Sequence, residues 1–190
     1  MAKAPNPSIS RASSLDAKAW TRAATDVLGD QGIDGVRVEA LAKQLGVTKG
    51  SFYWHFENRD ALLAAVLADW RRRATLGVIE RIEAQDGSAE NRLRLLMLVP
   101  FQLKSDGGGQ VELSIRLWAR RDPRARSALQ EVDELRLRYI ASLLREIGFP
   151  AERADARAIF AYAFQRVATS LIDRDDATAV ERCITELIAL

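Results

Sequence analysis

The stretch Val38–His55 reads VEALAKQLGVTKGSFYWH and fits the spacing of two short helices joined by a tight turn. Ala42 is small where the second helix must cross the first, and Gly46 tolerates the positive φ angle that such a turn requires. Many helical hairpins share this bare pattern, but its apolar positions also suit contacts between helices. The stretch therefore predicts a helix-turn-helix. The apolar contact positions are Leu41, Leu45, Val47 and Phe52.

The second of these helices, predicted over Thr48–Phe56, is rich in hydrogen-bond donors. Such donors suit phosphate oxygens, and the amide groups at the helix start add the positive end of its dipole. Gly50 has no side chain and permits close approach of the backbone to DNA. These features favour a DNA-reading helix, although Tyr53 and Trp54 can also be interior aromatics. The donor side chains are Thr48, Lys49, Ser51, Tyr53, Trp54 and His55.

Helical periodicity continues on both sides of this motif. Residues 1–13 have no apolar periodicity and are expected to form a mobile arm, with order beginning near Ser14. An apolar stripe from Leu15 to Leu28 predicts a helix that Gly29 and Gly32 end. Asn58 caps a further helix, which we expect to close on the arginines at 71–73.

The remaining sequence repeats helix and breaker without any sustained alternation of period two, so the predicted fold class is all-α. Pro100 should kink or break its helix, and the glycines at 107–109 predict a flexible loop. Asp122 is a predicted N-cap followed by proline at the first helical position. The expected helices cover 92–104, 111–121, 123–147, 152–172 and 177–189.

Residues 41–63, LAKQLGVTKGSFYWHFENRDALL, resemble the signature of the TetR family of bacterial transcriptional regulators. The resemblance implies a three-helix DNA-binding domain over residues 14–57 and a helical effector-binding and dimerisation domain over residues 58–190. Residues 58–73 would form the connecting helix. It also implies a regulator, expected to be a repressor, that binds a palindromic operator in double-stranded DNA and is released by a small ligand.

The resemblance assigns DNA contacts residue by residue. Thr48, Lys49, Gly50 and Ser51 would lie nearest the base edges, Tyr53, Trp54 and His55 would contact phosphates, and Arg59 would hold the DNA backbone. Two positions depart from the family pattern. Val38 stands where a threonine often contacts phosphate, and Arg37 beside it is expected to compensate, whereas Arg59 replaces a lysine and should substitute well.

The helix predicted over residues 152–172 is apolar around most of its circumference. Its composition alone suits either a central helix of a monomeric core or a helix that packs on its own core and on a second subunit. The resemblance favours the second reading and implies a homodimer formed through about residues 152–189. The last helix has a matching apolar stripe, from Val180 to Leu190.

A small-molecule site is predicted from large apolar side chains spread over this half. Each of these residues singly is more often plain core, but Pro100 should leave space beside two of them. The expected effector is mainly apolar or aromatic. The candidate residues are Met97, Phe101, Trp118, Tyr139, Phe160 and Phe164.

Composition excludes much other chemistry. With one cysteine and one histidine in 190 residues, the sequence predicts no metal site, no catalytic residues and no cofactor. No apolar run is long enough for a membrane span or a leader, so we expect no membrane partner and a cytoplasmic location. The net charge of +2 is an amino-terminal excess, because residues 1–73 carry +3 and residues 74–190 carry −1. An all-α enzyme or small-molecule carrier remains the main alternative, and a helical interaction module with a degenerate helix-turn-helix is the second.

Overall fold

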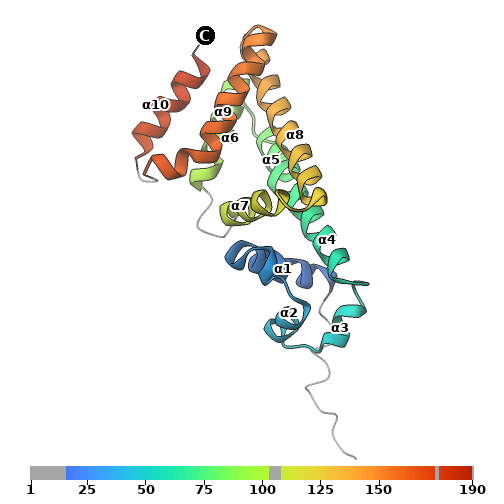
Figure 1. Ribbon diagram of the computed structural model, residues 1–190. Coiled ribbons are helices and arrows are strands. Elements are labelled where there is room, and N and C mark those ends of the chain that lie inside the picture. Colours follow the sequence, from blue (N-terminus) through green and yellow to red (C-terminus); the bar gives the residue numbers. More distant parts are fainter. Residues whose placement is uncertain (1–15, 103–107, 174–175, 190) are drawn as a thin grey trace, which may run out of the picture. The chain divides into compact units, whose positions relative to one another are not determined.

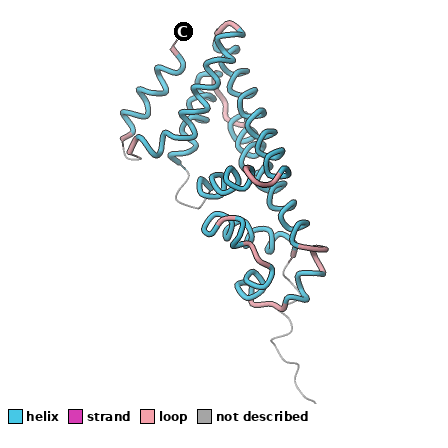
Figure 2. Tube along the Cα trace, in the orientation of Figure 1, coloured by secondary structure: helices cyan, strands magenta, loops and turns pink. Residues whose placement is uncertain are grey.

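A computed structural model of the chain describes residues 16–102, 108–173 and 176–189. Within these ranges all regular structure is helical and no strand occurs, which confirms the all-α class (Figure 2). The predicted arm at 1–13, the start near Ser14, Lys104 and the first part of the glycine loop lie outside the described residues.

The chain forms two compact units. In the described residues, unit 1 comprises 16–70 with 108–128, and unit 2 comprises 71–102, 129–173 and 176–189. These units are defined by contacts, whereas the division predicted at residues 57 and 58 follows chain order and function. The main difference is helix α7 (Gly108–Ala119), which belongs to unit 1 although residues 71–102 of unit 2 precede it in sequence.

Unit 1 contains α1 (Ala17–Gln31), the 3₁₀ turn η1 (Ile33–Gly35), α2 (Val38–Leu45), α3 (Lys49–Tyr53), most of α4 (Arg59–Arg71), and α7 (Figure 1). Asp16 caps α1 by accepting a hydrogen bond from the Ala19 amide at 2.9 Å. The prediction that Gly29 ends α1 is wrong, because the helix runs through it to Gln31 and ends at Gly32, whose φ is 71°. Gly29 is where α7 comes close, since a Cβ there would lie 3.1 Å from Val111 Cγ2.

The core of unit 1 is built around aromatic rings from its first and third helices. Trp20 and Phe52 are both fully buried and meet edge to face with their ring centroids 5.3 Å apart. Phe56 stacks on Phe52 at 5.6 Å. This cluster fixes α3 against α1. The apolar side chains that complete the core include Leu28, Leu41, Leu62, Leu63, Val66 and Ile115.

Helix α4 ends at Arg71, within the arginines 71–73 where the sequence predicted its end, but the chain stays helical beyond it. It passes into the π-helical turn η2 (Arg72–Leu76) and then into α5 (Gly77–Glu83). Cations stabilise a helix end but do not stop a helix, and no breaking conformation intervenes, since Gly77 adopts the helical φ of −66°.

Unit 2 contains η2, α5, α6 (Ala89–Gln102), most of α8 (Pro123–Ile147), α9 (Ala151–Leu171) and α10 (Ala177–Ile188). Helices α6, α9 and α10 lie side by side and contact one another (Figure 1). The start of α8 confirms the predicted cap, since the Arg124 amide donates to Asp122 Oδ1 at 2.9 Å. The buried core includes Leu93, Met97, Ile140, Leu143, Leu144, Ala158, Ala161 and Ile184.

Neither Pro100 nor the glycines at 108 and 109 break a helix. Gly108 and Gly109 belong to α7 and do not form a loop, and Pro100 lies inside α6. A proline at 100 cannot donate to the carbonyl of Leu96 four residues earlier. The buried side chain of Gln165 on α9 supplies that missing donor, with Nε2 2.9 Å from the Leu96 oxygen. A contact from another helix therefore lets α6 continue through its proline.

Candidate nucleic-acid interface

The turn between α2 and α3 has the predicted geometry. Gly46 has a left-handed backbone with φ 69° and ψ 29°, and its amide donates to the carbonyls of Ala42 and Lys43 at the end of α2. The Val47 amide donates to the Ala42 carbonyl at 3.0 Å. These bonds satisfy the last carbonyls of α2 and set the direction in which α3 leaves the turn. The predicted helix-turn-helix is therefore present in unit 1.

Helix α3 is shorter than predicted and ends at Tyr53, with Trp54 and His55 in a turn. Phe52 is fully buried, whereas Tyr53 is 55% exposed and Trp54 is 88% exposed. These two aromatics are therefore not interior. Thr48 occupies the N-cap position with extended backbone, but its hydroxyl makes no capping bond. The structure thus presents most of the predicted contact residues on one accessible surface: Thr48, Lys49, Gly50, Tyr53, Trp54 and His55, with Ser51 half-buried.

Lys49 has a partner that the sequence interpretation missed. Its ammonium donates a hydrogen bond to the carboxylate of Glu39 in the first turn of α2, and the two groups form an ion pair. The hydrogen bond from Lys49 lowers the pKa of the Glu39 carboxyl, and the same bond raises the pKa of Lys49. Both groups are therefore charged at neutral pH.

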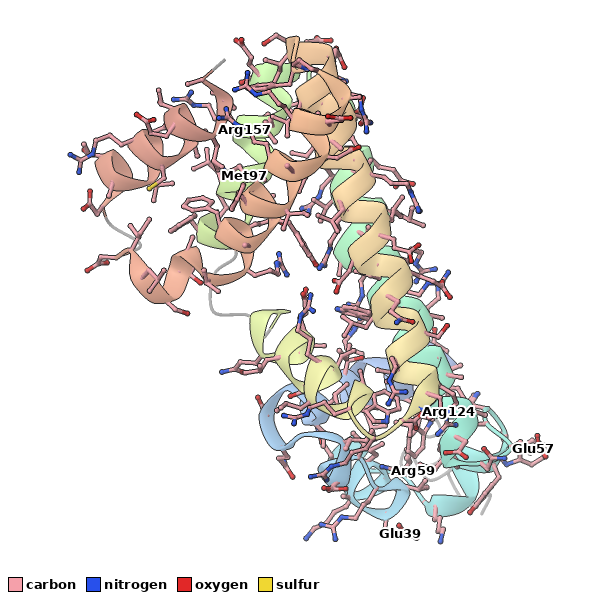
Figure 3. All side chains as sticks on the ribbon, turned by 45° about the horizontal axis from the view of Figure 1, so that its top comes forward. Glu39, Glu57, Arg59, Met97, Arg124 and Arg157 are labelled. Atoms are coloured by element: carbon pink, nitrogen blue, oxygen red, sulfur yellow. The ribbon has the colours of Figure 1, made fainter. Side chains whose placement is uncertain are left out.

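Arg59 at the start of α4 holds the segment that precedes α2. Its Nε donates to the Val36 carbonyl at 2.6 Å and its Nη2 donates to the Ile33 carbonyl at 2.7 Å. The structure thus gives Arg59 a scaffolding role within unit 1, where Figure 3 labels it. Arg37 is exposed immediately before α2, and the neighbouring Val38 is buried.

The six predicted effector residues are divided between the two units. Trp118 is buried in unit 1, whereas the other five belong to unit 2. Met97 is fully buried, and Phe101 meets Phe164 with ring centroids 6.4 Å apart. The Tyr139 hydroxyl donates to Glu83 at 2.5 Å, and Phe160 is 69% exposed. Met97 belongs to the buried core of unit 2, and Phe101, Tyr139 and Phe164 pack against that core.

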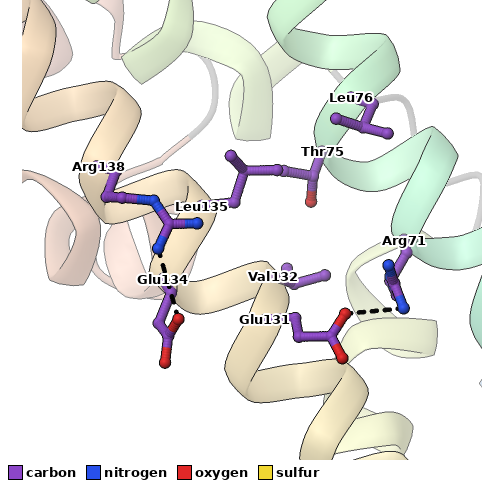
Figure 4. A pocket seen from close by; sticks show the side chains of 8 residues that line it. All are labelled: Arg71, Thr75, Leu76, Glu131, Val132, Glu134, Leu135 and Arg138. Atoms are coloured by element: carbon purple, nitrogen blue, oxygen red, sulfur yellow. Dashed lines mark hydrogen bonds and ion pairs between the residues drawn. The ribbon is translucent and has the colours of Figure 1, made fainter.

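A shallow hollow of about 280 Å³ lies in unit 2 between η2 and α8. None of the predicted effector residues lines it (Figure 4). Two ion pairs border it, with 2.8 Å between Arg71 and Glu131 and 3.5 Å between Arg138 and Glu134. Its charged rim does not match the apolar site that the sequence predicted. The remaining lining residues are Thr75, Leu76, Val132 and Leu135.

Unit 2 also contains a polar network that no sequence signal indicated. The Tyr162 hydroxyl donates to Asp133 at 2.5 Å and accepts a hydrogen bond from Arg136 at 3.0 Å. Arg136 also donates to the Ala74 carbonyl of η2 at 3.0 Å. The network joins α8, α9 and η2 through residues that are far apart in sequence.

Residues 16–102, 108–173 and 176–189 contain no group of acidic, histidine and cysteine side chains that is arranged to hold a metal ion. In those same ranges, no helix has the length and apolar character needed to cross a bilayer.

Comparison with known proteins identifies the segment that carries this surface. The profile of "Bacterial regulatory proteins, tetR family" matches residues 21–66, from α1 into α4. Residues 21–66 therefore match the TetR family. Class A tetracycline repressor protein from transposon 1721 of Escherichia coli is 49% identical over 45 residues, which are 24% of this chain and 21% of that protein. The chain thus spans about a fifth of the length of the curated relatives that it matches.

Solved structures resemble the chain over nearly its whole length. A regulator from Pseudomonas aeruginosa PAO1 superposes with a TM-score of 0.76 at 18% identity and covers 96% of this chain and 94% of its own. FadR from Bacillus subtilis, solved with stearoyl-CoA, gives a TM-score of 0.64 at 20% identity, covering 90% and 96%. At these identities the likeness establishes the TetR fold for both units.

Proposed function

We propose that this TetR-family protein is a homodimeric transcriptional repressor whose α3 helices enter major grooves of a palindromic operator. The observation that carries the proposal is the surface of α3. Helix α3 starts with a free N-cap hydroxyl and a cation at Thr48 and Lys49, and it ends in the exposed aromatics Tyr53 and Trp54. Donors of this kind suit phosphates and base edges. Two such helices related by a dyad would read half-sites about one helical turn or more apart.

The proposal assigns residues 14–57 to DNA binding and residues 58–190 to effector binding and dimerisation. The residues nearest the bases are Thr48, Lys49, Gly50 and Ser51. The residues that contact the DNA backbone are Tyr53, Trp54, His55, Arg37 and Arg59. Arg59 combines this role with its bonds to the carbonyls of Ile33 and Val36, since its Nη1 is not engaged in those bonds. A regulator of this kind acts in the cytoplasm, where its DNA is.

A gel-shift titration on the DNA that flanks the protein's own gene tests the DNA-binding function. We expect a sequence-dependent shift that weakens with added salt, at a log-log slope of about −0.9 for each phosphate neutralised. Lys49→Ala together with Tyr53→Ala should reduce affinity by about tenfold or more, because each contact is worth roughly 1 kcal/mol or more. Binding indifferent to sequence, or unchanged in the double variant, would overturn the proposal.

The dimer is proposed to form through residues 152–189. The outer face of α9 supports it, because large apolar side chains are exposed there although the opposite face is buried in unit 2. Contiguous apolar surface that is exposed to water marks an interaction site. The exposed residues are Ile159, Phe160, Val167 and Leu171, with exposed fractions of 61%, 69%, 48% and 79%.

We propose further that a small, mostly apolar effector bound in unit 2 near Met97, Phe101 and Phe164 shifts the connecting helix and releases the operator, with Tyr139 and Phe160 as further candidates. A coupling free energy of about 1 to 3 kcal/mol would give a response of about 5- to 150-fold. The FadR complex supports an acyl chain as the first probe, since stearoyl-CoA has a long apolar tail.

Stearoyl-CoA, octanoyl-CoA and free coenzyme A should therefore be compared in the gel shift. Release by the acylated molecules and not by coenzyme A supports an apolar effector. Met97→Trp, which fills the apolar group, should abolish the response and keep operator binding, whereas an unaltered response would place the effector elsewhere. If none of the three releases the operator, the acyl-chain assignment is wrong.

A further inference from the structure

Glu39 places a negative charge in the helix-turn-helix, whose other charged side chains are cations. From Arg37 to His55 the chain contains three cations, Arg37, Lys43 and Lys49, and Glu39 is the only carboxylate. A surface selected solely for affinity to a polyanion would gain from losing this charge. Its position therefore calls for an explanation beyond solubility.

The fold brings this carboxylate to the reading helix itself. Glu39 lies in the first turn of α2 and Lys49 is the first residue of α3, and the turn at Gly46 brings the two side chains into an ion pair. Both side chains remain about half or more exposed, at 66% for Glu39 and 51% for Lys49. Figure 3 shows Glu39 on the outside of unit 1. Water and DNA can therefore reach both members of the pair.

We propose that Glu39 is a specificity-determining residue that restrains Lys49 and selects against DNA of arbitrary sequence. The inference rests on the proposed DNA-binding function and adds a residue that this function does not include. On an arbitrary duplex, Lys49 gains a phosphate only by leaving Glu39, and the freed carboxylate then faces the negative backbone. Such a built-in repulsion discriminates between partners without strengthening the correct one.

An operator can compensate both groups at once. A lysine donates to guanine O6 and N7 in the major groove, and a carboxylate accepts from the cytosine N4 amino group. A guanine beside a cytosine thus replaces the Glu39–Lys49 pair with two base contacts and leaves no charge unsatisfied. The expected operator therefore carries guanine and cytosine at adjacent positions under the start of α3.

The experiment compares Glu39→Gln with Asp26→Asn in the full chain. Both substitutions remove one exposed carboxylate from unit 1, but Asp26 lies on α1 and so controls for net charge. Fluorescence anisotropy measures the dissociation constant for an operator fragment selected from genomic DNA and for a scrambled duplex of equal length, over a series of salt concentrations. Because both members of the pair are exposed, the melting temperature of Glu39→Gln should match that of the wild type.

Glu39→Gln is expected to tighten binding to the scrambled duplex by about fivefold at 0.15 M salt, which is the gain from one further phosphate contact, and to steepen the salt slope by about 0.9. Affinity for the operator should rise less, so the ratio of the two affinities falls. Asp26→Asn should change both duplexes equally. In a Lys49→Gln background, Glu39→Gln should lose most of its excess effect over the control.

Each other outcome overturns the inference. If Glu39→Gln behaves like Asp26→Asn on both duplexes, or if the affinity ratio stays the same or rises, Glu39 does not determine specificity, although the DNA-binding function stands. A wild-type chain that binds neither duplex would overturn the proposed function and this inference together.

Discussion

Helix α3 of unit 1 and helix α9 of unit 2 both bury one face and expose large side chains on the other, yet the exposed faces differ in kind. On α3 the exposed aromatics Tyr53 and Trp54 stand among donors and a lysine. On α9 the exposed face is aliphatic and phenyl, from Ile159 to Leu171. A ring with a polar edge beside a cation suits phosphate and bases, whereas a dry stripe suits another apolar surface. The side chains that surround an exposed apolar residue thus indicate whether its partner is a nucleic acid or another apolar protein surface.

The largest expected effect comes from the outer face of α9. Phe160→Asp places a charge in the proposed dimer interface and should yield a monomer. Because two linked half-site contacts exceed one by about 10²- to 10⁴-fold, operator affinity should fall by at least about a hundredfold. Size-exclusion with light scattering and gel shift measure the two effects. Gln130→Asp, at an exposed polar position of α8, is the control and should leave both unchanged. If Phe160→Asp remains a dimer and keeps its operator affinity, the exposed face of α9 is not the dimer interface.

The buried face of α3 gives the next largest effect. Phe52→Ala removes a fully buried ring that contacts Trp20 and Phe56, and should lower the free energy of unfolding by about 3 to 5 kcal/mol. Chemical denaturation followed by tryptophan fluorescence measures the loss. Tyr53→Ala, one residue away and largely exposed, should cost less than about 1 kcal/mol. Equal losses in the two variants would mean that α3 has no distinct inner face.

The buried face of α9 can be tested through Gln165. Gln165→Leu leaves the Leu96 carbonyl buried without a donor and should cost about 1 to 3 kcal/mol in denaturant titrations. In a Pro100→Ala background the new amide at position 100 can donate to that carbonyl, so Gln165→Leu should then cost clearly less. The double-mutant cycle isolates this exchange of donors. Additive costs would show that Gln165 does not compensate for the proline.

The outer face of α3 gives the smallest change in stability. The Thr48 hydroxyl makes no capping bond, so Thr48→Ala should alter the free energy of unfolding by no more than about 0.5 kcal/mol. Asp16 caps α1 in the same unit with a bond of 2.9 Å, and Asp16→Ala should cost about 1 kcal/mol. Gel shifts should show the opposite order, with Thr48→Ala weakening the operator complex more. A Thr48→Ala variant that is less stable but binds normally would make Thr48 a structural cap.

Local signals in the sequence were sufficient to predict several elements. Gly46 needs a left-handed backbone, and Asp122 before Pro123 combines a cap with a residue suited to the first helical position, so both boundaries lie where expected. Gly29 and Pro100 misled the interpretation because partners distant in sequence override their local preference. Val111 of α7 comes close to the glycine, and Gln165 serves the carbonyl that the proline leaves free.

The site was predictable to a similar degree. The sequence predicted donors on the surface of α3 and Phe52 as an apolar contact, and Phe52 is buried, but it did not decide whether Tyr53 and Trp54 are interior. The Glu39–Lys49 pair spans ten residues and a turn, which no helical spacing rule connects. Among the effector candidates, hydrophobicity alone did not separate exposed Phe160 from buried Met97, since both suit an apolar helix.

Arg59 gives unit 1 a mechanical property. Its guanidinium ties the first residue of α4 to two carbonyls of the segment that leads into α2, at Ile33 and Val36. A movement of α4 would thus act on the segment that precedes α2 as well as on the residues that follow α3. These two bonds would favour movement of α2, the turn and α3 as one body with α4. In the proposed dimer, a release signal would therefore change the separation of the two α3 helices and leave the surface of each helix intact.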